Sequence, residues 1–161
     1  LVLNGQPKWY AHTKAADERN KNRPIYWEIG ADCSELEPSL ERFIKRELAG
    51  YTGLCNIEMI GYNIIEAHLR GSNAFFDYYC EGFMAAWIKL VDHQVWEGLE
   101  PIEQGCLYSI FSLQALPENA EAHVEGMGAR LYRDGIMHDR QGIIFADTPY
   151  TAKLIEHELL K

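Results

Sequence analysis

The chain has 161 residues, 47% of them hydrophobic, and a formal net charge of −9. This size and composition allow a buried core, whereas the acidic charge argues against a nucleic-acid partner, because that binding depends on Lys and Arg that neutralise phosphates. Four widely spaced cysteines without a C-x-x-C pair, and no apolar run near the ~20 residues that span a bilayer, predict a cytoplasmic protein with free thiols and no membrane partner.

The first predicted element is a β-hairpin at the start of the chain. Asn4-Gly5 is a dipeptide typical of two-residue hairpin turns, and it would join residues 1–3 to a strand near 8–14. Because the sequence opens within this hairpin and without Met, we expect the chain to be a fragment of a longer protein.

A polar loop over 17–23 comes next, and it leads into a predicted strand over 24–29. Arg19, Lys21 and Arg23 in this loop are candidates for contacts with a phosphate or a carboxylate. The alternative is a solvated connection that binds no ligand.

The segment 34–48 predicts a helix. Ser34 is a residue type that caps helices, and acidic residues follow it in the first turn, where the helix dipole favours them. Apolar side chains recur at helical spacing and predict one buried face. They are Leu36, Leu40, Phe43, Ile44 and Leu48.

A second hairpin is predicted over 55–70, with a three-residue loop between its strands. If Ile60 pairs with Ile64 across this loop, Glu58 lies directly opposite Glu66. Because strand side chains alternate between faces, one face of this hairpin is polar and the other is apolar and buried. The polar face comprises Asn56, Glu58, Glu66, His68 and Arg70. The apolar face comprises Ile57, Met59, Ile65, Ala67 and Leu69.

The facing carboxylates of Glu58 and Glu66 predict a metal site. Facing like charges destabilise a sheet by some tenths of a kcal/mol up to about 1 kcal/mol, and a hard cation such as Mg²⁺ would remove that penalty. His68 is a candidate auxiliary ligand that would favour Mn²⁺, or it would hydrogen-bond a phosphate. The alternative is a solvated face without metal. A two-residue loop at Tyr62-Asn63 would instead pair Glu66 with Met59 and mix polar and apolar side chains on both faces.

Beyond this hairpin, the sequence predicts a helix over 74–91, capped by Ser72 or Asn73. Its many aromatic residues indicate that much of its surface is buried. The following segment, 98–147, reads mostly as short strands and loops. Strands are expected over 106–113, 130–133, 136–138 and 142–146. Asp134-Gly135 is a dipeptide typical of hairpin turns, and it would join the strands over 130–133 and 136–138.

The chain is predicted to end in a helix. Asp147 or Thr148 would cap it, and Pro149 lies in its first turn, where proline is tolerated. Its core face would comprise Leu154, Ile155 and Leu159.

The sequence CNIEMIGYNIIEAHLRGSN, residues 55–73, resembles the metal-binding hairpin of ATP-grasp enzymes. That family has an acidic residue on one strand and Glu-x-Asn-x-Arg on the next. Glu58 would match the first acid, Glu66 the second and Arg70 the arginine. His68 stands where the family normally has Asn, and the gap between the two acids is shorter than in most members.

The resemblance implies an α+β fold with an antiparallel sheet that carries helices on one side. Residues 1–95 would form a lobe similar to the C-terminal lobe of ATP-grasp enzymes, with the metal hairpin at 55–70. Residues 96–161 would form a small β-rich extension that ends in a helix, similar in outline to that of biotin-carboxylase-like members.

The resemblance also implies an activity. An ATP-grasp ligase uses Mg²⁺ (or Mn²⁺) and ATP to activate a small-molecule carboxylate as an acylphosphate, which an amine then attacks. Glu58, Glu66 and His68 would hold the metal, and Arg70 would be the catalytic arginine. Ser72 and Asn73 would approach the substrate. The N-terminal lobe, in cis or in trans, would complete the nucleotide site, so we expect this chain alone to be inactive.

Two other interpretations remain open. The chain fits a non-catalytic acidic α+β module for binding or assembly, including a homo-oligomer, whose hairpin charges are merely exposed to solvent. A metal-dependent hydrolase that uses the same carboxylates is a further alternative, although His68 is the only residue that could serve as its general base.

Overall fold

The computed structural model describes residues 1–71, 79–135 and 138–161. The fold class is α+β, as predicted: this part of the chain has four α-helices, a five-stranded antiparallel sheet and small hairpins. No helix within it is both long and apolar enough to cross a membrane. The chain forms two compact units, of which the first comprises Leu1–His12 and Asp32–Glu103, and the second Thr13–Ala31 and Gln104–Lys161.

The second unit is built on the five-stranded sheet, with the strand order β10-β11-β9-β6-β3. All neighbours are antiparallel. The strands are β3 (Thr13–Ala15), β6 (Tyr26–Ile29), β9 (Gly105–Phe111), β10 (Arg130–Arg133) and β11 (Arg140–Ala146). The central strand β9 and its neighbour β11 are rich in β-branched and aromatic residues, and most of their side chains are buried.

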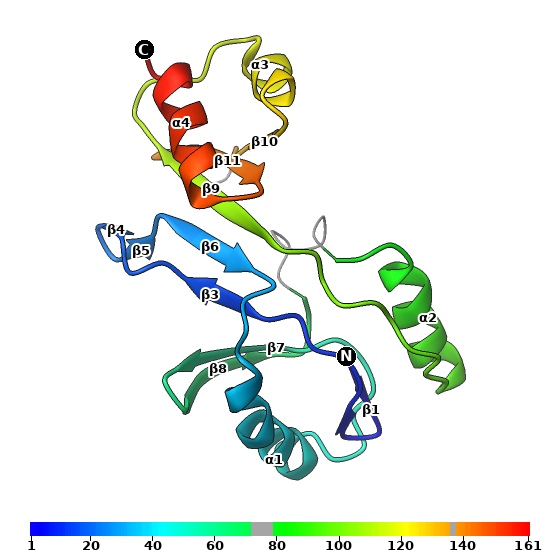
Figure 1. The fold of residues 1–161 in the computed structure, drawn as a ribbon. Helices are drawn as coiled ribbons and strands as arrows, with labels where there is room; N and C mark the ends of the chain where they lie inside the picture. Colours follow the sequence, from blue (N-terminus) through cyan, green and yellow to red (C-terminus); the bar gives the residue numbers. More distant parts are fainter. Residues whose placement is uncertain (72–78, 136–137) are drawn as a thin grey trace. The chain divides into compact units, whose positions relative to one another are not determined.

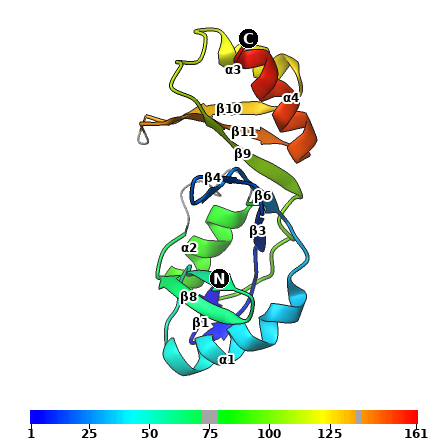
Figure 2. The same ribbon diagram turned by 90° about the vertical axis from the view of Figure 1, so that its left-hand side faces the viewer.

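Two helices, α3 (Ala120–Gly126) and α4 (Pro149–Leu159), pack on one face of this sheet (Figures 1 and 2). Alternate residues of the central strands point to this face, so that one side of β9 meets both helices. The buried cluster comprises Cys106, Tyr108, Ile110, Leu116, Ala120, Val124, Ala129, Ile144, Ala146, Ala152, Ile155 and Leu159.

The predicted start of the last helix is confirmed. Thr148 is its N-cap, and Pro149 is its first residue. The predicted core face is confirmed for Ile155 and Leu159 and is wrong for Leu154, which is 46% exposed. Ala152 takes the third buried position, because it lies three residues before Ile155 on the same side of the helix.

The predicted hairpin after residue 130 exists with a longer turn. β10 pairs with β11, which begins at Arg140, so the predicted return strand over 136–138 is replaced by Arg140–Ala146. His138 lies in a turn, and residues 136 and 137 are outside the described part. Arg140 closes the turn through an ion pair of 2.5 Å with the buried carboxylate of Asp134.

The first unit begins with the short hairpin that Asn4-Gly5 predicts. β1 (Val2–Leu3) pairs with β2 (Gln6–Pro7), and both turn residues have positive φ, 49° and 71°, as a type I′ turn requires. The expected long strand over 8–14 is wrong, since only Thr13–Ala15 is a strand there. Beyond Pro7 the hairpin has one further bond, from the Lys8 N–H to the Leu1 carbonyl at 2.9 Å, so β1 is too short to pair with a strand over 8–14.

In the described part of the first unit, the two α-helices start at other residues than expected. α1 (Glu37–Glu47) follows a short 3-10 helix at Ser34–Leu36, and the Ser34 hydroxyl donates to Asp32 instead of capping a helix. α2 (Phe83–His93) begins after Gly82, whose φ of 84° is left-handed and not helical. Residues 74–78 of the predicted helix, and its candidate caps at 72 and 73, are outside the described part, and 79–82 are not helical.

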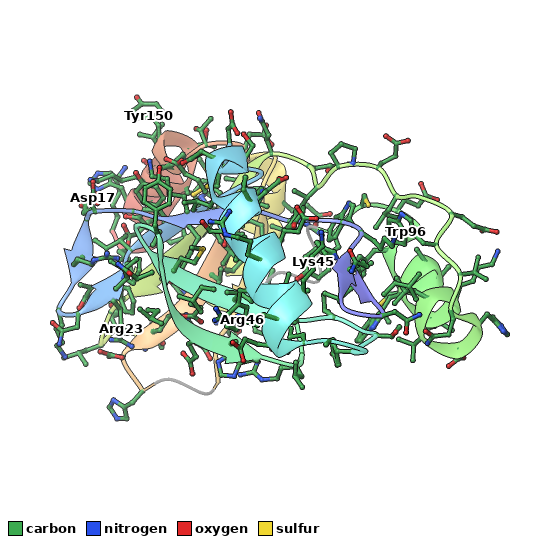
Figure 3. All side chains as sticks on the ribbon, turned by 90° about the horizontal axis from the view of Figure 1, so that it is seen from below. Asp17, Arg23, Lys45, Arg46, Trp96 and Tyr150 are labelled. Atoms are coloured by element: carbon green, nitrogen blue, oxygen red, sulfur yellow. The ribbon has the colours of Figure 1, made fainter. Side chains whose placement is uncertain are left out.

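A separate core cluster holds the first unit together around α2. Leu90 is fully buried at its centre, and Trp9 packs at a centroid distance of 5.5 Å from Phe83. Trp96, labelled in Figure 3, packs against the same cluster from the segment after α2. The buried members are Leu1, Trp9, Leu54, Phe83 and Leu90.

Candidate metal centre on the β7–β8 hairpin

The candidate site lies on a hairpin of the first unit, formed by β7 (Asn56–Ile60) and β8 (Asn63–His68). Glu58 pairs directly with Glu66, as predicted. The predicted pairing of Ile60 with Ile64 is wrong. Ile60 pairs with Asn63 instead, across the two-residue turn Gly61-Tyr62. An irregularity between the Glu58 and Met59 pairs leaves one extra residue on β8, and this bulge restores the opposition of the two acids.

The hairpin brings three potential ligands together. One ligand atom from each of Glu58, Glu66 and His68 lies within 4.8 Å of the others. The His68 Nε2 and Glu66 Oε1 atoms are 2.9 Å apart. Ligand bonds of about 2.0–2.2 Å place two ligands of one ion at most about 4.4 Å apart. Because the Glu58 and Glu66 side chains are exposed, small rotations are enough to close this set around an ion, so the residues fit a metal.

The charge balance of the hairpin also fits a cation. The two carboxylates face each other, and the polar partner of Glu66 is the His68 imidazole. Within residues 1–71, 79–135 and 138–161, no Lys or Arg forms an ion pair with Glu58 or Glu66. A bound divalent ion would therefore supply the positive charge that these side chains lack.

Arg70 lies beyond the end of the second strand. β8 ends at His68, and residues 69–70 form a bend, so strand alternation does not place the Arg70 side chain on the polar face. Its guanidinium donates to the Gly71 carbonyl at 3.1 Å. The predicted substrate residues Ser72 and Asn73 are outside the described part of the chain.

The weak candidates for phosphate binding belong to the second unit. Arg19 begins the small hairpin of β4 (Arg19–Asn20) and β5 (Arg23–Pro24) and is exposed. Arg23, labelled in Figure 3, pairs with Asp139 at 2.5 Å and lies 4.5 Å above the Phe111 ring. The hydrogen bond from Arg23 lowers the pKa of Asp139. Phosphate binding by Arg23 stays a prediction, and it would require Arg23 to leave this pair.

The apolar face of the metal hairpin is not buried as predicted. Ile65 is 56% exposed and Leu69 is 59% exposed, whereas Ile57 and Met59 are half-buried. The reason is that β7 and β8 form a two-stranded sheet of their own, so no larger sheet carries this face into a core.

A shallow cavity elsewhere in the first unit had no signal in the sequence. Its volume is about 280 Å³, and its lining comprises Pro7, Tyr10, Ser34, Glu37, Pro38 and Glu41. Beside it, His12 Nε2 lies 2.9 Å from Glu37 Oε1, and burial raises the pKa of Tyr10 to about 12. His12 and Glu37 are too far apart in the sequence for any local spacing to predict this pair.

A scan against models of protein families finds no match to the chain. Searches of curated proteins and of solved structures also return no match. The function is therefore argued from the geometry and chemistry of the site.

Proposed function

We propose that the β7–β8 hairpin is a divalent-metal site, and that the chain belongs to an ATP-dependent carboxylate ligase of the ATP-grasp type. The observation that carries the proposal is the direct pairing of Glu58 with Glu66, with His68 at 2.9 Å from Glu66. The resemblance of residues 55–73 to the ATP-grasp metal hairpin supplies the reaction class. The finer fold proposed with it is an ATP-grasp-like lobe with a β-rich C-terminal extension.

Each residue has a separate role in this proposal. Glu58 and Glu66 hold the metal from opposite strands, and His68 is an auxiliary ligand on the same face. When bound, Mg²⁺ or Mn²⁺ neutralises charge on the nucleotide phosphates. Arg70 binds phosphoryl oxygens, for which a guanidinium that donates two hydrogen bonds is well suited. Ser72 and Asn73 contact the acceptor substrate.

The proposed substrates are a small-molecule carboxylate and an amine, together with ATP. The carboxylate takes the γ-phosphoryl group of ATP, which forms an acylphosphate and releases ADP. The amine then attacks the acyl carbon, displaces inorganic phosphate and loses a proton, which gives an amide. In this class of reaction the nucleotide is enclosed between two lobes, so a second lobe in the same chain or in another would complete the site. We therefore expect the 161-residue chain alone to show no ligase activity.

A second candidate function is a non-catalytic module for binding or assembly. One observation favours it: large apolar side chains of the hairpin are exposed. They are Ile60 (68%), Tyr62 (68%), Ile65 (56%) and Leu69 (59%). In this case Glu58 and Glu66 would need no metal.

Metal binding to a Glu66→Gln variant distinguishes the two functions. We expect the wild-type chain to bind Mn²⁺, measured by electron paramagnetic resonance of the free ion, and Glu66→Gln to lose this binding. Without metal, the variant should be more stable by a few tenths of a kcal/mol in a urea titration, because one of two facing charges is gone.

The matched control is Glu37→Gln, which alters a glutamate that also contacts a histidine at 2.9 Å, away from the hairpin. It should bind Mn²⁺ as the wild type does. If Glu66→Gln changes neither metal binding nor stability, the metal site is refuted and the binding module is the better function.

A further inference from the structure

The candidate metal site contains one nitrogen donor beside its two carboxylates. The His68 Nε2 atom lies 2.9 Å from Glu66 Oε1. Two neighbouring ligands around an ion with bonds of about 2.1 Å are about 3.0 Å apart. His68 and Glu66 therefore already have the separation of two neighbouring ligands, and the exposed Glu58 carboxylate can rotate to join them.

A histidine–glutamate contact alone does not make such a site. His12 and Glu37 have the same Nε2–Oε1 distance of 2.9 Å. In the described residues, however, no third His, Cys, Asp or Glu completes that pair, and the hairpin holds the one such group of three. The hairpin thus combines an imidazole with two opposed carboxylates, and the His12 pair provides an internal reference for it.

The imidazole decides which ions this donor set prefers. Mg²⁺ favours oxygen ligands and gives up its water reluctantly, whereas imidazole nitrogen suits first-row transition ions. Mn²⁺ accepts both carboxylate oxygen and imidazole nitrogen. Replacing an oxygen ligand by a histidine therefore favours Mn²⁺ over Mg²⁺, although the two carboxylates can hold either ion.

We infer that His68 is the specificity-determining residue of the site: it binds the ion through Nε2 and makes the hairpin prefer Mn²⁺ over Mg²⁺. This inference rests on the proposed metal site. When the ion binds, His68 Nε2 gives up its contact with Glu66 and binds the ion instead. The carboxylates of Glu58 and Glu66 remain ligands of the same ion. The substrate of the site would then be a nucleotide complexed with Mn²⁺ rather than with Mg²⁺.

The test compares the wild type with His68→Asn, which keeps a polar side chain but offers oxygen in place of nitrogen. Mn²⁺ binding is measured by electron paramagnetic resonance, and Mg²⁺ binding by its competition with Mn²⁺. We expect the wild type to bind Mn²⁺ at least about tenfold more tightly than Mg²⁺, and His68→Asn to lose most of that difference. Electron spin echo spectra should show ¹⁴N coupling to Mn²⁺ in the wild type and none in His68→Asn.

Two further variants separate the possible failures. His12→Asn should leave the ¹⁴N coupling and the Mn²⁺ preference unchanged. Glu66→Gln should abolish binding of both ions if the metal site is real, whatever His68 does. If both ions bind and depend on Glu66, but His68→Asn keeps the Mn²⁺ preference or the wild type lacks ¹⁴N coupling, only the role of His68 is refuted. If neither ion binds the wild type, both proposals fail.

Discussion

At the scale of single residues, burial and one hydrogen bond have opposite effects on the pKa of Glu156. Glu156 lies half-buried on α4, and the Tyr108 hydroxyl donates to its Oε2 at 2.8 Å. Burial raises the pKa of Glu156, and the hydrogen bond from Tyr108 only partly opposes that change. The second unit therefore contains a carboxyl group that is partly removed from water, which disfavours its charged form.

This position predicts a pH-dependent stability. Because the folded-state pKa of Glu156 lies above the ordinary value of 4.5, its contribution to stability is full below pH 4.5 and is lost as the pH rises through the folded-state pKa. Glu156→Gln should raise the free energy of unfolding at pH 7 by up to about 1 kcal/mol, since the amide oxygen still accepts from Tyr108 without a charge. Urea titrations at pH 7 and pH 4 measure both values, and the gain should shrink at pH 4.

The control for this prediction is Tyr108→Phe, which removes the donor and leaves the carboxylate. It should lower the free energy of unfolding at pH 7, by about 1–2 kcal/mol, because the carboxylate loses its hydrogen bond. A Glu156→Gln variant that is less stable than the wild type at pH 7 would show that the carboxylate stabilises the fold.

At the scale of elements, local chemistry determines helix starts where one cap dominates. Thr148 has extended backbone angles, φ −139° and ψ 153°, and its Oγ1 accepts from the Thr151 N–H at 3.1 Å. Pro149 follows in the first position of α4, where its missing N–H costs nothing. At α1, by contrast, no side chain caps the helix, and it begins at Glu37, two residues later than a cap at Ser34 would place it.

The α4 cap can be tested by substitution. Thr148→Ala should lower the free energy of unfolding by about 1 kcal/mol, because the Thr151 N–H loses its acceptor. Thr148→Ser keeps the acceptor oxygen and should retain most of the stability. Urea titrations followed by circular dichroism measure both variants. Equal losses in the two would show that the Thr148 methyl group, rather than the hydroxyl, supports the helix.

At the scale of the whole molecule, two separate cores divide the chain. The cluster around Leu90 belongs to the first unit, and the cluster around Ile155 belongs to the second. The units are interleaved in sequence, since Thr13–Ala31 joins the second unit between two parts of the first. Each unit is therefore expected to have its own local stability.

Matched cavity variants test this independence. Leu90→Ala and Ile155→Ala each remove a fully buried side chain and should cost about 2–5 kcal/mol in the unit that contains it. In native-state hydrogen exchange, Leu90→Ala should lower the protection of amides around α2, and Ile155→Ala that of amides in β9 and β11. If either variant lowers protection equally in both units, the chain unfolds as one cooperative body.

The candidate site was predictable from the sequence because its geometry is local. Glu58 and Glu66 are close in sequence, and period-two alternation about one turn is enough to bring them face to face. The turn itself was not predictable, since a two-residue turn with a bulge and a three-residue turn give the same opposition. The position of Arg70 was not predictable either, because it depends on where β8 ends.

Features that depend on neighbouring residues could be read from the sequence alone: the Asn4-Gly5 turn, the Thr148 cap and the opposed acids of the hairpin. The three-dimensional structure was needed to show which strands pair, such as β6 with β9, and that Arg23 contacts Asp139. It was also needed to show that the apolar face of the β7–β8 hairpin is exposed. The difference lies in the sequence separation of the residues that interact. Turns, caps and alternation follow from the backbone geometry of a few residues, whereas burial depends on distant segments whose contacts leave no local pattern.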